Sequence, residues 1–146
     1  MRQSIAAFAL FHRESEGRAL WLAQWNERWE AFHLVGGHKR PTESFRECAI
    51  REVSEELRLA EDKEFVVADQ PVAHLEYSAW SRSANEQTGY IMELFEARLV
   101  GREADRIVNS LPSNRWLSES EILAKKSNDG LAVSETMERL LAEARA

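Results

Sequence analysis

Cysteine is nearly absent from this chain, since Cys48 is the only one among 146 residues. A single thiol cannot form an internal disulfide, and we expect it to be a small buried side chain in a protein of a reducing compartment. The apolar run at residues 5–11 is too short to span a membrane, and its flanks lack the basic region and cleavage site of a signal peptide. We therefore expect a cytoplasmic protein.

An excess of positive charge is also missing. The chain has 19 Lys and Arg against 25 Asp and Glu, a formal net charge of -6 and a pI near 5.3. Nucleic acid polymers and anionic membranes are bound through clustered basic side chains, so neither is an expected partner. A phosphorylated small molecule would have to be recruited by bound cations or by a few placed arginines.

Linkers, internal repeats and low-complexity tracts are absent as well. At 44% hydrophobic residues, a chain of this length can bury a core without disulfides or structural metal. The sequence predicts one domain over residues 1–146.

Short apolar or alternating segments separated by polar turns predict seven strands. They lie at residues 4–12, 18–25, 29–35, 65–68, 72–80, 88–99 and 115–117. Helical spacing predicts a helix at 43–57 with Thr42 as its cap, a brief helix at 121–124 after the cap Ser118, and a terminal helix at 131–145. Residues 81–87 and 101–114 are expected to be loops. This order predicts an α/β fold with a mixed sheet between helical layers.

The helix at 43–57 gathers carboxylates beside its apolar stripe. The stripe repeats every four residues, as Phe45, Ala49, Val53 and Leu57. At about 100° per residue, Glu52 and Glu56 fall at its edge, with Glu55 next to them. Like charges four residues apart destabilise a helix, and negative charge near its end opposes the dipole. Such a breach of local rules is expected where function selects the residues.

Two interpretations of these glutamates stay open at this point. The helix can be a solvated face on which Arg51 pairs with Glu47 and Glu55, four residues to either side. Alternatively, the carboxylates hold Mg²⁺, a hard cation that takes oxygen ligands and is usually bound by one or two carboxylates together with substrate phosphates. The second interpretation explains why the carboxylates flank the apolar stripe.

The spacing of the fixed residues carries a resemblance. Gly37, five residues, Glu43, seven residues and then the run Arg51-Glu52-Val53-Ser54-Glu55-Glu56, closing with Leu59, resembles the signature box of the Nudix hydrolases. The match covers a 23-residue box with nearly every fixed position filled. It implies a Nudix-type α/β/α sandwich with a mixed β-sheet between helices.

The resemblance also implies a reaction. Nudix hydrolases cleave a diphosphate bond, usually in a nucleoside diphosphate linked to another moiety such as a nucleotide, a sugar or ADP-ribose, with Mg²⁺ or Mn²⁺ as cofactor. The metal would polarise phosphoryl oxygens and lower the pKa of a bound water. The partner implied is a small phosphorylated molecule. The alternative is a nucleotide-sensing or protein-binding module that kept the fold and lost useful catalysis, and a homodimer is left open.

The resemblance assigns roles position by position. Glu52 and Glu56 are implied as principal metal ligands, and Glu55 as a further ligand or the group that activates water. Arg51 is implied to orient the glutamates, and the carbonyl of Gly36 to complete a metal site.

Gly37 and Glu43 are structural positions of the box, the latter tying its loop to the helix. Arg58 stands where the family has a glycine, so the usual left-handed helix cap is missing. Either Arg58 adopts a positive φ at a cost of about 1 kcal/mol, or the helix ends in another way. Val35 replaces a commonly found proline.

A late acidic residue that could serve as general base has no clear match. Glu103 and Asp105 lie in the expected loop, and Glu93 and Glu96 on the strand before it are alternatives.

Aromatic side chains near strand ends are candidates for substrate binding. Trp25, Trp29 and Trp80 could stack on a nucleobase for about 1 to 3 kcal/mol per base. The competing interpretation places them in the core or a dimer interface. His38 follows the glycines and could approach a phosphate, although a water-exposed loop histidine is the simpler interpretation.

Overall fold

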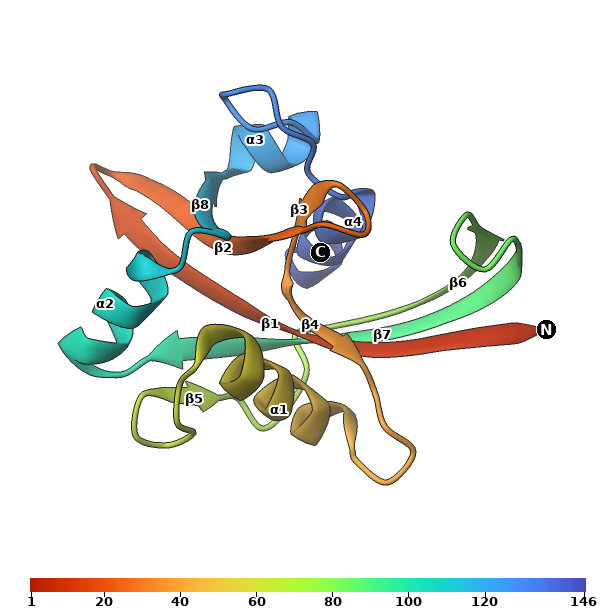
Figure 1. The fold of residues 1–146 in the computed structure, drawn as a ribbon, viewed down its shortest axis with the longest axis horizontal. Coiled ribbons are helices and arrows are strands. Elements are labelled where there is room, and N and C mark those ends of the chain that lie inside the picture. Colours follow the sequence, from red (N-terminus) through yellow and green to blue (C-terminus); the bar gives the residue numbers. More distant parts are fainter.

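The computed structural model describes all residues 1–146 and contains one mixed sheet of eight strands (Figure 1). The strands are β1 (Arg2–Ser15), β2 (Arg18–Asn26), β3 (Ala31–His33), β4 (Val35–His38), β5 (Phe65–Val67), β6 (Ala73–Ser81), β7 (Glu86–Leu99) and β8 (Asn114–Ser118). The order is β3-β2-β1-β7-β5, with β4 on β1, β6 on β7 and β8 on β2. The β1–β7 pair is parallel and the other pairs are antiparallel. The sheet is therefore mixed, as predicted.

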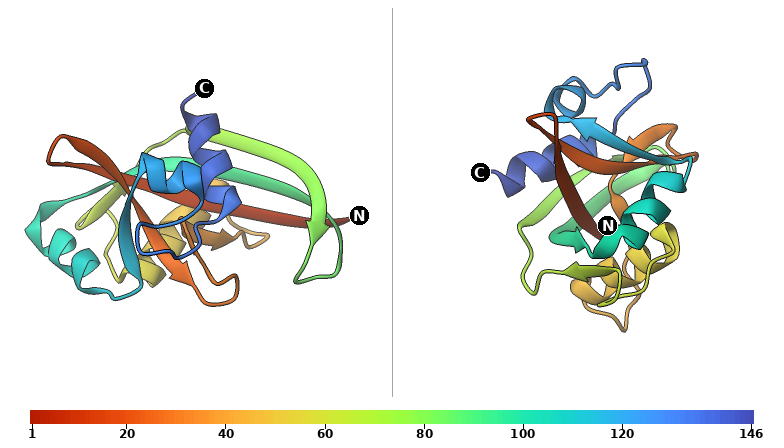
Figure 2. Two further views of the ribbon diagram at one scale, coloured as in Figure 1. Left: turned by 90° about the horizontal axis from the view of Figure 1, so that it is seen from above. Right: turned by 90° about the vertical axis from the view of Figure 1, so that its left-hand side faces the viewer.

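Helices cover both faces of this sheet. They are α1 (Phe45–Leu57), α2 (Gly101–Ser110), α3 (Glu119–Ala124) and α4 (Glu135–Ala144). In the right-hand view of Figure 2, α1 and α2 lie on one side of the strands and α3 and α4 on the other. This arrangement is the α/β/α sandwich that the sequence predicted.

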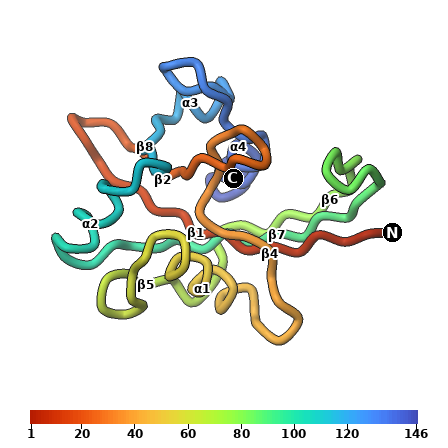
Figure 3. Tube along the Cα trace, in the orientation of Figure 1, coloured from red at the N-terminus to blue at the C-terminus, as the bar shows by residue number.

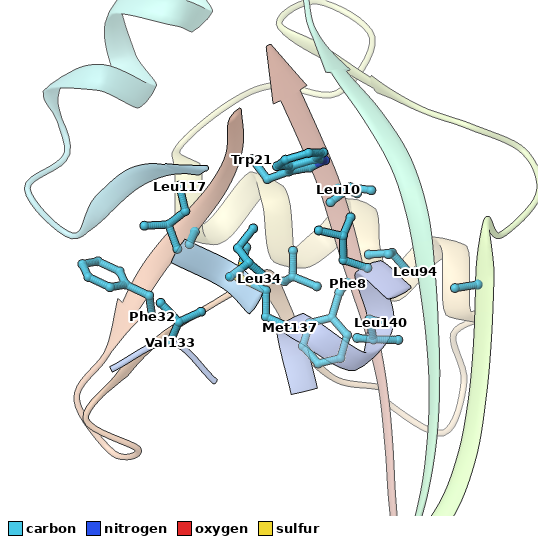
Figure 4. Close-up of a cluster of buried hydrophobic side chains, with 14 of the residues drawn as sticks. Phe8, Leu10, Trp21, Phe32, Leu34, Leu94, Leu117, Val133, Met137 and Leu140 are labelled. Carbon is cyan, nitrogen blue, oxygen red and sulfur yellow. The ribbon is translucent and has the colours of Figure 1, made fainter. Parts of the chain in front are cut away.

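β1 is the central strand, and its alternate side chains fill two separate cores. Ala7, Ala9 and Phe11 belong to the cluster beneath α1 and α2. Phe8 and Leu10 belong to the cluster that also contains Met137 and Leu140 of α4 (Figure 4). Because side chains alternate across a strand and both faces are covered, the strand is apolar without interruption. The apolar run that opens the sequence is thus explained as the middle of the sheet.

The third predicted strand is two strands. β3 pairs with β2 and β4 pairs with β1, so the chain changes partner at Leu34. Gly36 and Gly37 lie within β4, opposite Phe8 and Ala7, whereas the sequence suggested that they begin a loop. The loop begins after β4 and carries the chain away from the sheet before it returns into α1 (Figure 3).

The prediction of a loop at residues 101–114 was wrong, because α2 occupies most of this segment. Ala104 and Val108 are fully buried four residues apart, and Ile107 packs against the same core, while most of the other residues are charged or polar. A stripe of three apolar residues was too narrow to be recognised among charged neighbours.

The helix boundaries also differ in detail. Ser44, and not Thr42, caps α1, because its hydroxyl accepts the backbone N–H of Glu47 while the Glu47 carboxylate accepts the N–H of Ser44. This capping box satisfies two of the N–H groups left free at a helix start. Ser118 caps α3 as predicted, and α4 begins at Glu135. None of the four helices is long and apolar enough to cross a membrane.

Candidate active site

The buried face of α1 fixes the orientation of the helix on the sheet. Cys48, Ala49, Val53 and Leu57 are fully buried along one stripe, which packs on β1 and β4. Burial raises the pKa of the Cys48 thiol to about 11, so it is an uncharged packing group. The polar side chains beside this stripe are held against β4 as a consequence.

Arg51 joins the helix to the chain that precedes it. Its Nη2 and Nε donate to the two carboxylate oxygens of Glu43 at 2.7 and 3.0 Å, and Nη2 also donates to the carbonyl of His38 at 3.1 Å. These hydrogen bonds lower the pKa of Glu43 to about 2. Glu43 also accepts the backbone N–H of Arg40 at 2.8 Å. The loop between β4 and α1 is therefore pinned at its middle.

The other side of the Arg51 guanidinium reaches two of the site glutamates. Nη1 lies 3.2 Å from Glu52 and 3.4 Å from Glu55. Glu52 is largely enclosed, whereas the Glu55 side chain is 54% exposed and also approaches Arg40 at 3.9 Å. Arg51 is thus placed to orient glutamates, and it holds Glu55 on the solvent side.

The two glycines of β4 allow the carboxylates to approach the strand. A Cβ on Gly37 would lie 2.6 Å from the Glu52 Oε1, so any side chain there would displace this carboxylate. A Cβ on Gly36 would overlap the backbone of β1 at Phe8. The backbone N–H of Gly36 donates a hydrogen bond to the carboxylate of Glu56 at 3.1 Å. The strand thus forms a cradle that only glycine can supply for Glu52 and Glu56.

Glu56 is held in an unfavourable environment for a charged carboxylate. Burial, followed by repulsion from Glu52, raises the pKa of Glu56 to about 8. Strongly raised carboxyl pKa values are concentrated at functional sites, because holding two buried acids close together destabilises the fold.

These residues fit a divalent cation, within limits that the geometry sets. Glu52 and Glu56 supply neighbouring carboxylate oxygens in a partly enclosed cradle, the donor type that Mg²⁺ and Mn²⁺ prefer. The structure contains no group of three or more His, Cys, Asp or Glu side chains arranged to hold a metal ion, since Glu55 turns toward arginines. One or two carboxylates with substrate phosphates is the usual magnesium arrangement, and the pair meets that requirement.

A cavity of about 280 Å³ opens beside this pair. Its lining includes Glu56, Gly36 and Gly37, together with Arg2 of β1, Ser81 of β6 and Ser83 of the turn after β6. Glu56 is its only acidic lining residue. The volume is close to the lower end of small-ligand sites, and the lining combines aromatic rings with polar groups.

Three of the four predicted substrate-binding residues line this cavity. Trp25 is half-buried, with its ring 5.1 Å from that of Phe32, and Trp29 is 47% exposed. His38 lines it too, with Nε2 at 3.2 Å from the Ser4 hydroxyl. Trp80 is exposed on β6 and does not line the cavity.

Sequence reasoning missed several lining residues. His33 lies fully enclosed within β3, and Gln24 donates to the carbonyl of Glu56 at 3.3 Å. Arg2 and Arg28 bring positive charge. The only signal in the sequence was that His33 lies on an apolar strand three residues before Gly36. A single sequence does not distinguish such a histidine from one that is simply packed in the core.

None of the four candidates for a late general base lines the cavity. Glu103 forms an exposed ion pair with Arg106 on α2, and Asp105 lies 4.0 Å from Arg13. On β7, Glu93 pairs with His74 at 2.8 Å, and Glu96 lines a separate surface hollow.

Comparison with known proteins agrees with this geometry. A family model described as the NUDIX domain matches residues 2–137. A search of curated proteins found no match.

Solved structures share the fold over nearly the whole chain. A mutT/nudix family protein from Listeria innocua superposes with a TM-score of 0.68 at 18% identity, covering 99% of this chain and 93% of that one. The C. elegans Ap4A hydrolase gives 0.62 at 16% identity, with 98% and 96% covered. Shewanella oneidensis NrtR gives 0.65 at 13% identity, and this chain spans 62% of its length.

Proposed function

This chain belongs to the NUDIX domain family, and from that premise we propose that it hydrolyses a diphosphate bond in a nucleoside diphosphate linked to another moiety. The observation that carries the proposal is the Glu52–Glu56 pair, which β4 cradles with two glycines at the end of a nucleoside-sized cavity. The Ap4A hydrolase among the similar structures is consistent with this reaction class.

In this proposal some residues of the site bind the metal ion and another orients the residues that bind it. Glu52 and Glu56, with the carbonyl of Gly36, would hold Mg²⁺ or Mn²⁺. When bound, the ion would supply positive charge to the phosphoryl oxygens and acidify a water. Arg51 keeps the glutamates in place through its contacts with Glu43 and Glu52.

Glu55 is our candidate for the group that accepts the proton from the attacking water. It lies on the solvent side of the carboxylate pair, 3.4 Å from Arg51. A carboxylate within reach of water can act as a general base once the substrate is positioned. Glu55 does not line the cavity, but it is adjacent in sequence to Glu56, which does, whereas no acidic residue of α2 or β7 lines it.

The cavity supports a single nucleoside as the bound part of the substrate. Its aromatic lining from Trp25 and Trp29 suits a flat ring, and Arg2, Arg28 and His38 suit phosphate or ribose oxygens. The phosphates would then extend toward Glu56.

A substrate screen tests this function. The purified chain would be incubated with Mg²⁺ and nucleoside triphosphates, ADP-ribose, nucleotide sugars and dinucleoside polyphosphates. We expect turnover of at least one, with a loss of about 100-fold or more in Glu56→Gln. Glu143→Gln, on the exposed face of α4, makes the same charge change away from the site and should leave turnover unchanged. No turnover on any compound, or full turnover in Glu56→Gln, would defeat the proposal.

A nucleotide-sensing module is the second candidate, favoured by the outward orientation of Glu55. NrtR shares the fold and has been crystallised with a 27mer DNA, although this chain spans only 60% of that protein. Calorimetric binding of a nucleotide without hydrolysis would support this candidate over the enzyme.

A further inference from the structure

His33 of β3 is a buried polar side chain that the proposed chemistry leaves unused. It is 4% exposed and has two aromatic rings beside it. The ring of Phe8 stacks on it at a centroid distance of 4.9 Å with an interplanar angle of 20°, and the tilted ring of Trp29 lies at 4.8 Å and 32°. The two nitrogens at the edge of the imidazole are its hydrogen-bonding groups.

The backbone fixes which nitrogen of His33 carries the proton. The N–H of Leu34 lies 2.6 Å from Nδ1, so Nδ1 must act as the acceptor. A neutral imidazole then carries its hydrogen on Nε2. Burial lowers the pKa of His33 to about 3, which keeps the ring neutral at physiological pH. His33 is therefore a fixed donor at Nε2 and has no role as an acid or base near neutrality.

That donor has no partner within the protein. Nε2 is enclosed, and no protein atom lies within hydrogen-bonding distance of it. Buried N–H groups without a partner are rare, because each destabilises the fold to an extent comparable with a lost hydrogen bond. The hydrogen bond at Nδ1 and the two adjacent rings leave the imidazole little freedom to turn. The fold thus retains an unpaired donor in a rigid setting.

The position of His33 indicates what the donor is for. It lines the same cavity as Glu56 and Gly37, and its covering ring, Trp29, belongs to the exposed turn between β2 and β3. Nε2 itself is enclosed in this structure, so a flat ligand in the cavity meets the imidazole edge only when a neighbouring side chain moves aside. An aromatic heterocycle with an acceptor in its plane matches both the rings and the donor.

We propose that the Nε2–H of His33 donates a hydrogen bond to an acceptor atom on the nucleobase of the substrate and so selects among bases. The inference rests on the proposed function and goes beyond it, because it names the recognising atom. The acceptor is a keto oxygen or an unprotonated ring nitrogen. A base that presents an amino group at this point would leave two donors facing each other and would be rejected.

Nuclear magnetic resonance of the wild-type protein tests the proposal without turnover. The buried Nε2–H of ¹⁵N-labelled protein would be followed while AMP, GMP, CMP and UMP are added separately in the absence of metal. We expect this resonance to shift with the nucleotide that binds most tightly and to remain in place with the weakest. A resonance that does not move when a nucleotide saturates the protein would overturn the proposal.

Affinities of a variant provide the second measurement. His33→Phe keeps a ring between Phe8 and Trp29 and removes the donor. We expect its affinity for the preferred nucleotide to fall by roughly 5- to 100-fold, with the weakest nucleotide unchanged, so that discrimination is lost. His12→Phe makes the same change at an exposed site outside the cavity and should keep the wild-type ranking.

The outcomes separate this inference from the function on which it rests. Four unchanged affinities in His33→Phe, with nucleotides still bound, would defeat the role of His33 alone. Failure of the wild-type protein to bind any of the four nucleotides would overturn the role of His33, whereas the proposed function fails only if the substrate screen finds no turnover. If His33→Phe does not fold, the resonance of the wild-type protein still decides the question.

Discussion

The carboxylate of Glu43 and the guanidinium of Arg51 meet in a two-point contact, with oxygen to nitrogen distances of 2.7 and 3.0 Å. This contact links the loop after β4 to the second turn of α1, and the same guanidinium reaches Glu52. The position of one site carboxylate is therefore coupled to the conformation of the loop. Lysine carries the same charge but cannot form the two parallel hydrogen bonds.

Arg51→Lys is expected to lower kcat by about 10- to 100-fold, which is typical for loss of a residue that orients metal ligands. The reduced activity should be accompanied by weaker Mg²⁺ activation, measured as the metal concentration for half-maximal rate. Arg46→Lys on the same helix, whose guanidinium contacts the backbone at Val67 and Ala68, is the control. Equal metal dependence in both variants and the wild type would contradict an orienting role.

Gly37→Ala is expected to reduce activity by about 10-fold or more, because its Cβ would lie 2.6 Å from Glu52 Oε1 and push the carboxylate aside. Gly89→Ala is a matched control in β7, where the nearest atom to the new Cβ is the flexible end of Met1 at 3.4 Å. Steady-state kinetics and thermal unfolding of both variants would be measured. A Gly37→Ala enzyme with full activity would show that Glu52 does not need its present position.

The raised pKa of Glu56 predicts how stability depends on pH in the metal-free protein. Its folded value of about 8 lies above the ordinary value of 4.5, so the folded state holds the proton more tightly. The stabilisation is complete below about pH 4.5 and is lost as the pH rises through 8, and the full shift corresponds to something on the order of 5 kcal/mol. Glu56→Gln should lack this component.

Thermal unfolding in EDTA from pH 5 to 9 measures this difference. The Tm of the wild type should fall toward high pH relative to that of Glu56→Gln, and added Mg²⁺ should restore it in the wild type alone. Parallel Tm profiles for the two proteins would show that Glu56 is ionised normally.

Arg58 ends α1 with φ 58° and ψ 42°, in the left-handed region that glycine adopts more readily. Arg58→Gly is expected to stabilise the fold by about 0.5 to 1 kcal/mol and to leave kcat unchanged, since the site carboxylates precede it. Lys125→Gly tests the same effect at the end of α3, where φ is 55°. Denaturant unfolding is the measurement, and destabilisation by both substitutions would contradict the strain argument.

Val108 tests the packing of α2, the helix that sequence reasoning missed. Its side chain is fully buried, so Val108→Ala should destabilise the protein by about 2 kcal/mol through lost burial and a small cavity. Arg102→Ala on the exposed face of the same helix should change stability by about 0.5 kcal/mol or less. Equal effects in urea unfolding would mean that α2 is not packed on the sheet as described.

Local patterns in the sequence predicted the central elements of this protein and pointed to its family. The four-residue stripe from Phe45 to Leu57 predicts α1 and its buried face, because helical periodicity depends only on spacing along the chain. The same spacing places Glu52 and Glu56 beside that stripe. The resemblance of residues 37–59 to the signature box led to the family that comparison then confirmed.

Only the tertiary structure decided which groups lie opposite those carboxylates. The pairing of β4 with β1 brings Gly37 against Glu52 and the N–H of Gly36 to Glu56, and no local pattern encodes a strand partner. Glu55 turned outward because Arg51 and Arg40 lie there. The unpaired donor of His33 is enclosed in a region where Phe8 and Trp29, from different parts of the chain, pack against the imidazole. Contacts between distant segments depend on packing that the spacing of residues along the chain does not encode, and in this protein they shape the cavity beside Glu56.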